Sequence, residues 1–356
     1  MSELLTEAGE HQARARLALT AALASGPSHA YLFRGPRGAG KAAVARAFAA
    51  EILAADAADA EDARRRVLID PSPHPDLVWL RPRGAQHMVE EVRERVIRAS
   101  SYRPFESEKR VFVIEAAEQM RDESQNALLK TLEEPPDFVH LILLTAEPSM
   151  LLETIASRCQ PIDFAPLPPE VVEARLAGSG SPEEIAAAAR LSAGDVARAQ
   201  FLLSDSGRAL RAAALDLEGD WLKVLKTAES AGEEAEAETR DLLDEEAEAG
   251  VKRSARDIAD EAKRAGRRRR TETLDLALEL NASLFRDLAA TASGATDVVF
   301  NRDHLADLQS RAESLDPSRP RRAAELVQDT RRRLDLNVSE ELALEALAFR
   351  LAAVFA

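Results

Sequence analysis

The sequence has a single cysteine, Cys159, among 356 residues, and aromatic residues make up only 4%. One thiol excludes an intrachain disulfide and a zinc site built from several cysteines. The sequence also lacks any apolar run near the ~18 residues that a membrane-spanning helix needs. Its polar N-terminus has no apolar core of a secretion signal. We therefore expect a cytoplasmic protein with no membrane partner.

An excess of positive charge is missing as well. The formal net charge is −15, whereas unaided binding of a DNA backbone depends on Lys and Arg that neutralise phosphates. The negative net charge argues against a protein that binds DNA without partners. It still allows a basic surface in one part of the protein. Hydrophobic residues at 46% and charged residues at 31% are typical of a globular protein, and the length allows two or three domains with separate cores.

Short apolar segments alternate with helical patterns over residues 1–165, as in an α/β domain with a parallel sheet. Residues 111–114 and 141–145 are apolar almost throughout, which suits central strands covered on both faces. The expected strands are 31–34, 76–80, 110–114, 141–145 and 160–164, and the expected helices are 8–25, 41–55, 87–100, 122–134 and 148–157.

From residue 166 onward strand patterns nearly vanish and we expect helices. The sequence Ser-Pro-Glu-Glu at 181–184 is a helix start, with an N-cap serine, a proline at the first helical position and acids near the positive helix end. In the last helix, two alternative sets of residues can form the packed stripe. One is Leu342, Ala346 and Phe349, and the other is Leu344, Leu347 and Leu351.

Charge is segregated in the middle of this helical region. Residues 228–249 are heavily acidic and residues 252–270 are heavily basic. One interpretation is a solvated helical extension kept soluble by its charges. The other is that Arg267–Arg270 contact DNA or a partner protein.

Residues 35–42, "GPRGAGKA", match the phosphate-binding P-loop except at the last position. Gly35, Gly38 and Gly40 allow a tight turn between a strand and a helix, where backbone N–H groups suit phosphate oxygens. Lys41 would reach the β- and γ-phosphates. Ala42 replaces the Ser or Thr whose hydroxyl would bind Mg²⁺, so the metal loses a direct ligand.

A second acidic element of a nucleotide-hydrolysing site is expected at the end of an apolar strand. Glu115 has this place, but Ala116 follows it and cannot act as a base. Together with Ala42, this predicts hydrolysis that is absent or very weak. Binding of ATP or ADP, with weak Mg²⁺, stays open.

Four motifs appear in a fixed order: "SHAYLFRGPRGAGK", "HPDL", "NALLKTLEEPP" and "SRC". Together they resemble the clamp-loader branch of the AAA+ ATPases and, within it, the delta-prime subunits of DNA polymerase III in high-GC bacteria. The resemblance is strong over residues 10–165, weaker over 166–204, and rests mainly on helical character beyond 205. It implies a RecA-like AAA+ P-loop domain at 1–165, a helical lid at 166–207 and an all-α collar for ring assembly at 208–356, with the charged segment 228–270 inside it.

The resemblance also implies roles for single residues. Arg158 of "SRC" would act as an arginine finger in the ATP site of a neighbouring subunit, since its charged fork suits γ-phosphate oxygens; the alternative is a surface salt bridge. Thr145 and Arg198 would be sensor residues of the nucleotide pocket, or else make local contacts, Thr145 as a helix cap and Arg198 with Asp195. Cys159 is expected to be a small buried residue.

One departure from the family concerns zinc. Such subunits commonly carry a four-cysteine zinc module between the P-loop helix and "HPDL", whereas residues 51–77 here contain no cysteine. His74 with scattered acids does not supply a tetrahedral ligand set. We therefore expect no zinc and no other metal centre, and a module that is lost or replaced by a helical segment with a salt-bridged surface.

The function implied is that of a clamp-loader subunit with a degenerate ATPase site of its own. Its partners would be the gamma/tau and delta subunits and, indirectly, the sliding clamp and primer-template DNA. One alternative is an ATP-hydrolysing tau/gamma-like motor, against which Ala42 and Ala116 argue. The others are an AAA+ adaptor in recombination or regulation, against which the paired "NALLKTLEEPP" and "SRC" motifs argue, and a non-replicative scaffold, which would explain only the charged segment.

Overall fold

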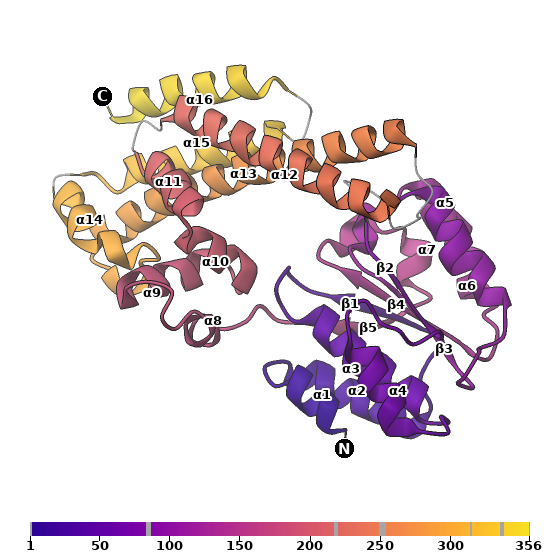
Figure 1. Cartoon of the computed structure of the whole chain (residues 1–356). Helices are drawn as coiled ribbons and strands as arrows, with labels where there is room; N and C mark the ends of the chain where they lie inside the picture. The colour runs from indigo at the N-terminus through magenta and orange to yellow at the C-terminus, as the bar shows by residue number, and fades with distance from the viewer. Residues whose placement is uncertain are drawn as a thin grey trace. The chain divides into compact units, whose positions relative to one another are not determined.

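The computed structural model describes residues 2–82, 87–216, 220–248, 254–313, 315–334 and 338–355. The chain divides into two compact units, Met1–Leu167 and Pro168–Ala356 (Figure 1). A further division of the second unit into a lid at 166–207 and a collar at 208–356 remains a prediction.

The first unit is built on a five-stranded sheet with the order β2-β3-β4-β1-β5. All four neighbouring strand pairs are parallel. The strands are β1 (Ala30–Arg34), β2 (Leu77–Leu80), β3 (Arg110–Ile114), β4 (Val139–Thr145) and β5 (Gln160–Asp163). Each lies within two residues of the segment expected from the sequence, and every residue of β3 and β4 is buried. The predicted parallel α/β fold is confirmed.

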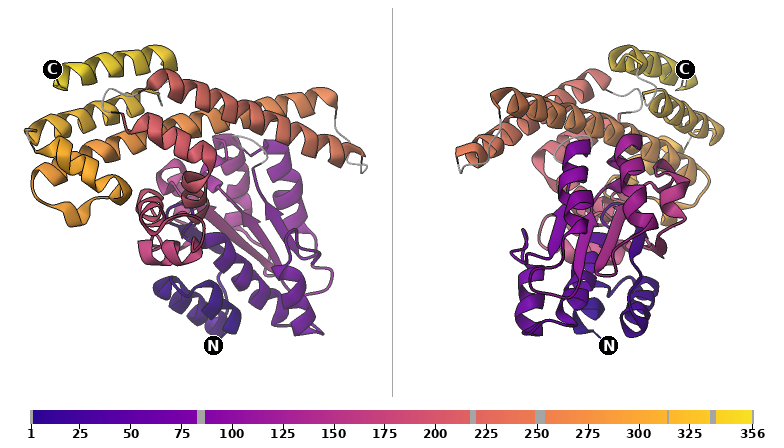
Figure 2. Two further views of the ribbon diagram at one scale, coloured as in Figure 1. Left: turned by 60° about the vertical axis from the view of Figure 1, so that its left-hand side comes forward. Right: turned by 90° about the vertical axis from the view of Figure 1, so that its right-hand side faces the viewer.

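Helices cover both faces of this sheet (Figures 1 and 2). One face packs against α1 (Glu3–Ala8), α2 (Ala13–Ser25), α3 (Lys41–Ala54) and α4 (Ala60–Leu68). The other packs against α5 (Val89–Val92), the π-helical segment Arg93–Arg98, α6 (Asp122–Glu133) and α7 (Glu153–Ala156). Because side chains alternate along a strand, Phe33 enters the first core and Leu32 the second.

The second unit is helical in its described parts. Its helices are α8 (Pro169–Arg175), α9 (Pro182–Leu191), α10 (Val196–Leu203), α11 (Asp205–Ala214), α12 (Trp221–Glu248), α13 (Ala255–Ala292), α14 (Leu305–Ala312), α15 (Ser318–Leu334) and α16 (Glu340–Phe355). The helix start predicted at 181–184 is confirmed, since Ser181 and Glu184 form a reciprocal capping box and Pro182 opens α9. No helix among the described residues is long and apolar enough to span a membrane.

The long helices α12 and α13 run side by side (Figure 2). They approach closely at Gly232 and Gly266, where a Cβ on Gly232 would lie 2.9 Å from the carbonyl oxygen of Gly266 and a Cβ on Gly266 would lie 2.7 Å from that of Gly232. Glycine is required at both positions because any side chain would push the helices apart.

The last helix shows which of the two predicted stripes is packed. Leu344, Leu347 and Leu351 are buried, while Leu342 and Phe349 are 64% and 80% exposed. α16 packs mainly on α15, so its second apolar stripe faces away from the helices of its own unit.

Candidate functional site

The P-loop connects the carboxyl end of β1 with the start of α3. Gly38 and Gly40 have φ values of +73° and +84°, which side chains rarely adopt. At Gly35 a Cβ would lie 2.3 Å from the carbonyl oxygen of Phe164, so this glycine is needed for a close backbone approach. The predicted glycines therefore do form a strand–turn–helix loop.

The side chain of Lys41 lies over the loop itself. Its Nζ donates to the carbonyl oxygens of Gly35 and Pro36, at 2.5 and 2.7 Å. The helix start has no side-chain cap and offers the positive end of a 14-residue helix. These groups fit a phosphate, whereas the Ala42 methyl group offers no oxygen to a metal ion.

Glu115, which follows β3, has hydrogen-bond partners in and just after β2, the strand at one side of the sheet. The Glu115 carboxylate accepts hydrogen bonds from Trp79 Nε1 at 2.8 Å and from Arg81 Nε at 3.2 Å. Arg81 also binds Asp70 through both terminal nitrogens, at 3.2 and 2.7 Å. The guanidinium of Arg46 lies 4.3 Å from the centre of the Trp79 ring and pairs with Asp70 at 3.0 Å. Glu115 is thus engaged in a network that the sequence did not reveal.

Protonation states agree with this network. The hydrogen bond from Arg81 holds the pKa of Asp70 below its usual value, and Asp70 in turn raises the pKa of Arg81. Burial lowers the pKa of His87, so its ring is neutral and Nε2 donates to the Glu115 carbonyl oxygen at 2.7 Å. Ala116 then has a φ of +47°, a strained turn that leaves a methyl group where a catalytic acid would stand.

Thr145 ends β4 and is fully buried. Its hydroxyl oxygen accepts the Glu147 N–H at 3.1 Å, and its carbonyl oxygen accepts the Gly35 N–H at 3.2 Å. The hydroxyl thus makes a local turn contact, while the backbone ties β4 to the P-loop. The role of a nucleotide sensor remains a prediction.

Arg158 lies just before β5, at the amino edge of the sheet. It pairs with Glu133 at 2.7 Å and donates to the Thr154 carbonyl oxygen at 2.9 Å. It borders a pocket of about 360 Å³ that also includes His29 and Gln160, both at the amino ends of strands. The salt bridge joins side chains that are 35% and 48% exposed, so it is weak and readily exchanged for another partner.

The P-loop and Arg158 therefore stand at opposite edges of one sheet. β1 and β5 are parallel, with Tyr31 beside Gln160, so the residue before β5 lies near the start of β1. The P-loop begins where β1 ends. Arg158 consequently cannot serve the P-loop of its own domain.

Arg198 belongs to the second unit and lies in the first turn of α10. Its guanidinium pairs with Glu279 at 3.0 Å. Asp195, the alternative partner expected from the sequence, instead caps the helix by accepting the N–H groups of Ala197 and Arg198. The local partner expected for the side chain was therefore wrong, and the sensor role stays a prediction.

The basic run Arg267–Arg270 is spread around α13. Arg268 pairs with Glu272 at 3.2 Å, and Arg270 pairs with Glu340 at 2.8 Å. Arg269 borders a groove beside α12. The four arginines do not form a single patch, because consecutive helical residues point in directions about 100° apart.

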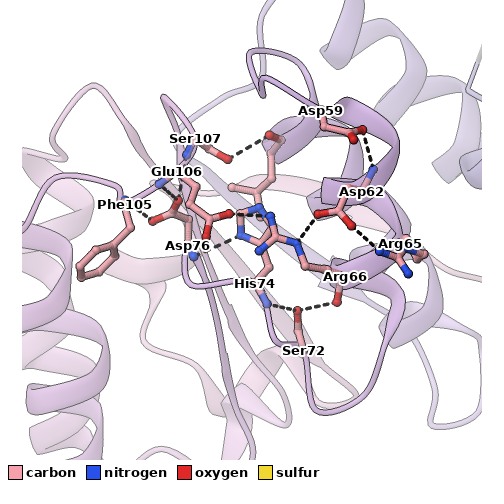
Figure 3. Close-up of polar contacts among 11 residues, drawn as sticks. Asp59, Asp62, Arg65, Arg66, Ser72, His74, Asp76, Phe105, Glu106 and Ser107 are labelled. Atoms are coloured by element: carbon pink, nitrogen blue, oxygen red, sulfur yellow. Dashed lines mark hydrogen bonds and ion pairs between the residues drawn. The ribbon is translucent and has the colours of Figure 1, made fainter.

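The acidic residue of "HPDL" has a structural role that the sequence did not reveal (Figure 3). Asp76 is fully buried just before β2, and its carboxylate accepts the backbone N–H groups of Phe105, Glu106 and Ser107 at 2.7, 2.9 and 3.0 Å. These three donors belong to the loop that leads into β3. A single carboxylate therefore fixes the entry to the neighbouring strand.

The segment expected to replace a zinc module is a helix with a charged surface, α4. Arg66 pairs with Asp62 at 2.8 Å and with Glu106 at 2.5 Å, across to the loop before β3 (Figure 3). Arg64 pairs with Glu51 of α3 at 3.0 Å. Among the described residues no three His, Cys, Asp or Glu side chains are placed to hold a metal ion.

Cys159 is buried, as predicted. Burial raises the pKa of its thiol to about 12, so the thiol stays protonated and is a poor nucleophile at neutral pH.

Comparison with known proteins finds relatives of the first unit. Residues 12–168 match the family model described as "DNA polymerase III, delta subunit". The DNA polymerase III subunit delta-prime of Bacillus subtilis is 38% identical over 151 residues, which are 42% of this chain and 46% of that protein. The DNA polymerase III subunit gamma/tau of Mycobacterium tuberculosis is 37% identical over 154 residues, 42% of this chain and 26% of that protein.

A solved structure of a DNA polymerase III gamma-subunit-related protein from Thermotoga maritima covers 95% of this chain and 98% of its own, with a TM-score of 0.46 and 14% identity. The sequence matches span less than half the length of these curated relatives. The family-model match over residues 12–168 covers the P-loop, the "HPDL" and "NALLKTLEEPP" segments and Arg158. Over this matched region, the chain is similar to the DNA polymerase III delta family and to a curated delta-prime subunit.

Proposed function

We propose that the chain is a cytoplasmic clamp-loader subunit that assembles with gamma/tau-type and delta-type subunits and supplies Arg158 to the ATP site of one neighbour. In this role it helps the assembly place a sliding clamp on primed DNA. The observation that carries the proposal is the separation of Arg158 from its own P-loop, at opposite edges of one sheet. An arginine at the amino edge is useful for ATP hydrolysis only in trans.

The chain's own P-loop acts as a scaffold that still has the geometry to bind a nucleotide phosphate. Three glycines, the N-terminus of α3 and Lys41 would hold the phosphates of ATP or ADP. Hydrolysis needs more. With Ala42 in place of a hydroxyl and Glu115 bound to Trp79 and Arg81, Mg²⁺ would be held weakly, and Ala116 supplies no base.

Assembly would use the second unit. The exposed stripe of α16, with Leu342 and Phe349 at the spacing of a helix face, leaves apolar surface in contact with water. A helix of another subunit packed against this stripe would bury it. This exposed stripe of α16 is therefore the candidate surface through which the predicted collar would contact another subunit.

The motor alternative requires this chain to hydrolyse ATP. The similarity to gamma/tau favours this alternative. The hydrogen bonds from Trp79 and Arg81 to Glu115 argue against it, because they engage the acid that hydrolysis would need. Purified chain should therefore release phosphate from ATP no faster than its Lys41→Ala variant. Turnover that Lys41→Ala abolishes would establish the motor function and overturn this part of the proposal.

Co-purification tests the assembly. The chain, mixed with gamma/tau-type and delta-type subunits of the same source, should elute with them from a sizing column. The assembled material should hydrolyse ATP faster than the same subunits without this chain. Elution as a separate species would contradict the proposed role.

A further inference from the structure

A groove lined by positive charge runs along α12 in the second unit. Lys223 and Lys226 enter it from the start of α12, and Arg269 enters from the neighbouring α13. Ser204 and Ser206, at the N-terminus of α11, line the same groove. The elements are in direct contact, since α11 packs on both α12 and α13 (Figure 1). The hollow is about 480 Å³, enough for one phosphate group and its neighbours.

None of the three cations is paired within the described part of the chain. Most arginines nearby are paired, including Arg268 with Glu272 and Arg270 with Glu340. Three unpaired charges of one sign around one hollow repel each other. All three side chains are exposed, so they are accessible to an anion that enters the groove.

The start of α12 is capped by an acid. The first turn of the helix contains no acidic residue, but the Asp220 carboxylate just before it accepts the Lys223 N–H at 3.1 Å, so the side chains of Lys223 and Lys226, rather than the helix end, supply the positive charge here. The start of α11 is also satisfied within the fold, because the Ser204 hydroxyl accepts the Gly207 N–H at 3.1 Å and donates to the Phe201 carbonyl oxygen at 2.7 Å, and Asp205 stands in the first turn.

Acidic residues confine the positive region to one end. Glu234 and Glu238 line the groove one to two turns further along α12. Ser230 separates them from the lysines and donates to Glu234 at 3.3 Å. An extended anion would therefore be held at the Lys223 end and repelled from the Glu238 end.

We propose that this groove binds a phosphate group, with Lys223, Lys226 and Arg269 as its charged contacts and the Ser206 hydroxyl as a hydrogen-bonding group. The ligand class is a phosphate ester, and a phosphodiester of a nucleic-acid strand is the source that three spaced cations suit best. The inference is independent of the clamp-loader role, because it rests on groups of the second unit alone.

The test compares two triple variants of the full chain with equal charge change. One is Lys223→Gln, Lys226→Gln and Arg269→Gln. The control is Arg256→Gln, Lys263→Gln and Arg267→Gln, which removes three exposed cations of α13 that also lack a partner in the described structure. Binding of a labelled single-stranded oligonucleotide is measured by fluorescence anisotropy between roughly 50 and 200 mM salt. Circular dichroism and thermal melting check that both variants fold.

The groove variant should bind the strand about tenfold more weakly than wild type, and the slope of log K against log salt should flatten by about 2, since each lost contact contributes ~0.7 for a single strand. The control should change affinity less than twofold. Inorganic phosphate at constant ionic strength should compete in the wild type but not in the groove variant.

Equal loss of binding in both variants would show that bulk charge alone attracts the strand, and would overturn the proposal. So would unchanged binding in the groove variant. If inorganic phosphate binds the wild type and the strand does not, the phosphate site stands and its source is a free phosphate. If an acidic peptide binds and neither inorganic phosphate nor the oligonucleotide does, the proposed phosphate site is wrong.

Discussion

The two edges of the parallel sheet in the first unit differ in what their charged groups are free to do. At the carboxyl edge, Lys41 lies over P-loop carbonyls and Glu115 is bound by Trp79 and Arg81. At the amino edge, Arg158 holds one exposed and weak salt bridge. At the edge where an active P-loop enzyme performs catalysis, the two charged side chains therefore have partners within the domain. The opposite edge presents an arginine outward.

The difference is the one that the proposed function would require. If the P-loop site has lost hydrolysis, its side chains can be satisfied by their neighbours, as Glu115 is. If Arg158 acts on another subunit, its charge needs a partner that it can exchange. Both arrangements depend on contacts between distant parts of the chain.

The largest effect is expected from a substitution of Arg158 at the amino edge of the sheet. Arg158→Lys keeps a positive charge but loses the planar fork, so ATP turnover at the neighbouring site that depends on it should fall roughly 10³-fold. Turnover and elution of the assembled complex are measured together. Arg98→Ala, which removes an exposed helix pair with Glu94, is the control and should leave turnover unchanged. Full activity of Arg158→Lys would mean that charge alone is sufficient.

The next effect concerns the fold at the same edge. Asp76→Ala would leave three N–H groups of residues 105–107 without an acceptor, and we expect a loss of roughly 3 kcal/mol in the free energy of unfolding. Denaturant unfolding measures it. Asp137→Ala, at an exposed position, should change stability by less than about 0.5 kcal/mol. Equal small losses would show that the loop is held by other contacts.

A moderate effect is expected at the second unit. Phe349→Glu places a charge on the exposed stripe of α16, and association with the other subunits should weaken about tenfold or more. The melting temperature of the isolated chain should not change, because Phe349 is 80% exposed. Leu17→Glu, at a position 73% exposed in the first unit, is the matched control. Unchanged assembly would remove α16 from the contact surface.

The smallest effect is a pH dependence that both edges share. Burial lowers the pKa of His87, at the carboxyl edge, and of His140, at the amino edge. Their stabilising contribution is complete above the unfolded pKa near 6.5 and is lost as the pH falls through the lower folded values. The melting temperature should therefore fall between about pH 6.5 and 5. His87→Gln and His140→Gln should each reduce this fall, whereas the exposed His304→Gln should not.

The sequence predicted local features well. All five strands and the P-loop could be located because a short apolar run or a glycine spacing determines them within a few residues. In the segment where we expected the zinc module to be lost or replaced by a salt-bridged helix, α4 with its Arg66 pairs is such a helix.

What the sequence could not provide were partners distant along the chain. Trp79 and Arg81 meet Glu115 only because β2 and β3 lie side by side. Asp76 meets residues 105–107 for the same reason. Arg198 pairs with Glu279, which is 81 residues away along the chain, rather than with the nearby Asp195. The choice between the two stripes of α16 likewise required knowing where α15 lies.

The most direct test compares the two edges in one assembled complex. Single-turnover release of phosphate from ATP is measured after Lys41→Ala and after Arg158→Ala in this chain alone. The account predicts that Lys41→Ala leaves the rate within about twofold of wild type, while Arg158→Ala abolishes the fast phase at one neighbouring site. A rate that falls with Lys41→Ala and survives Arg158→Ala would contradict it.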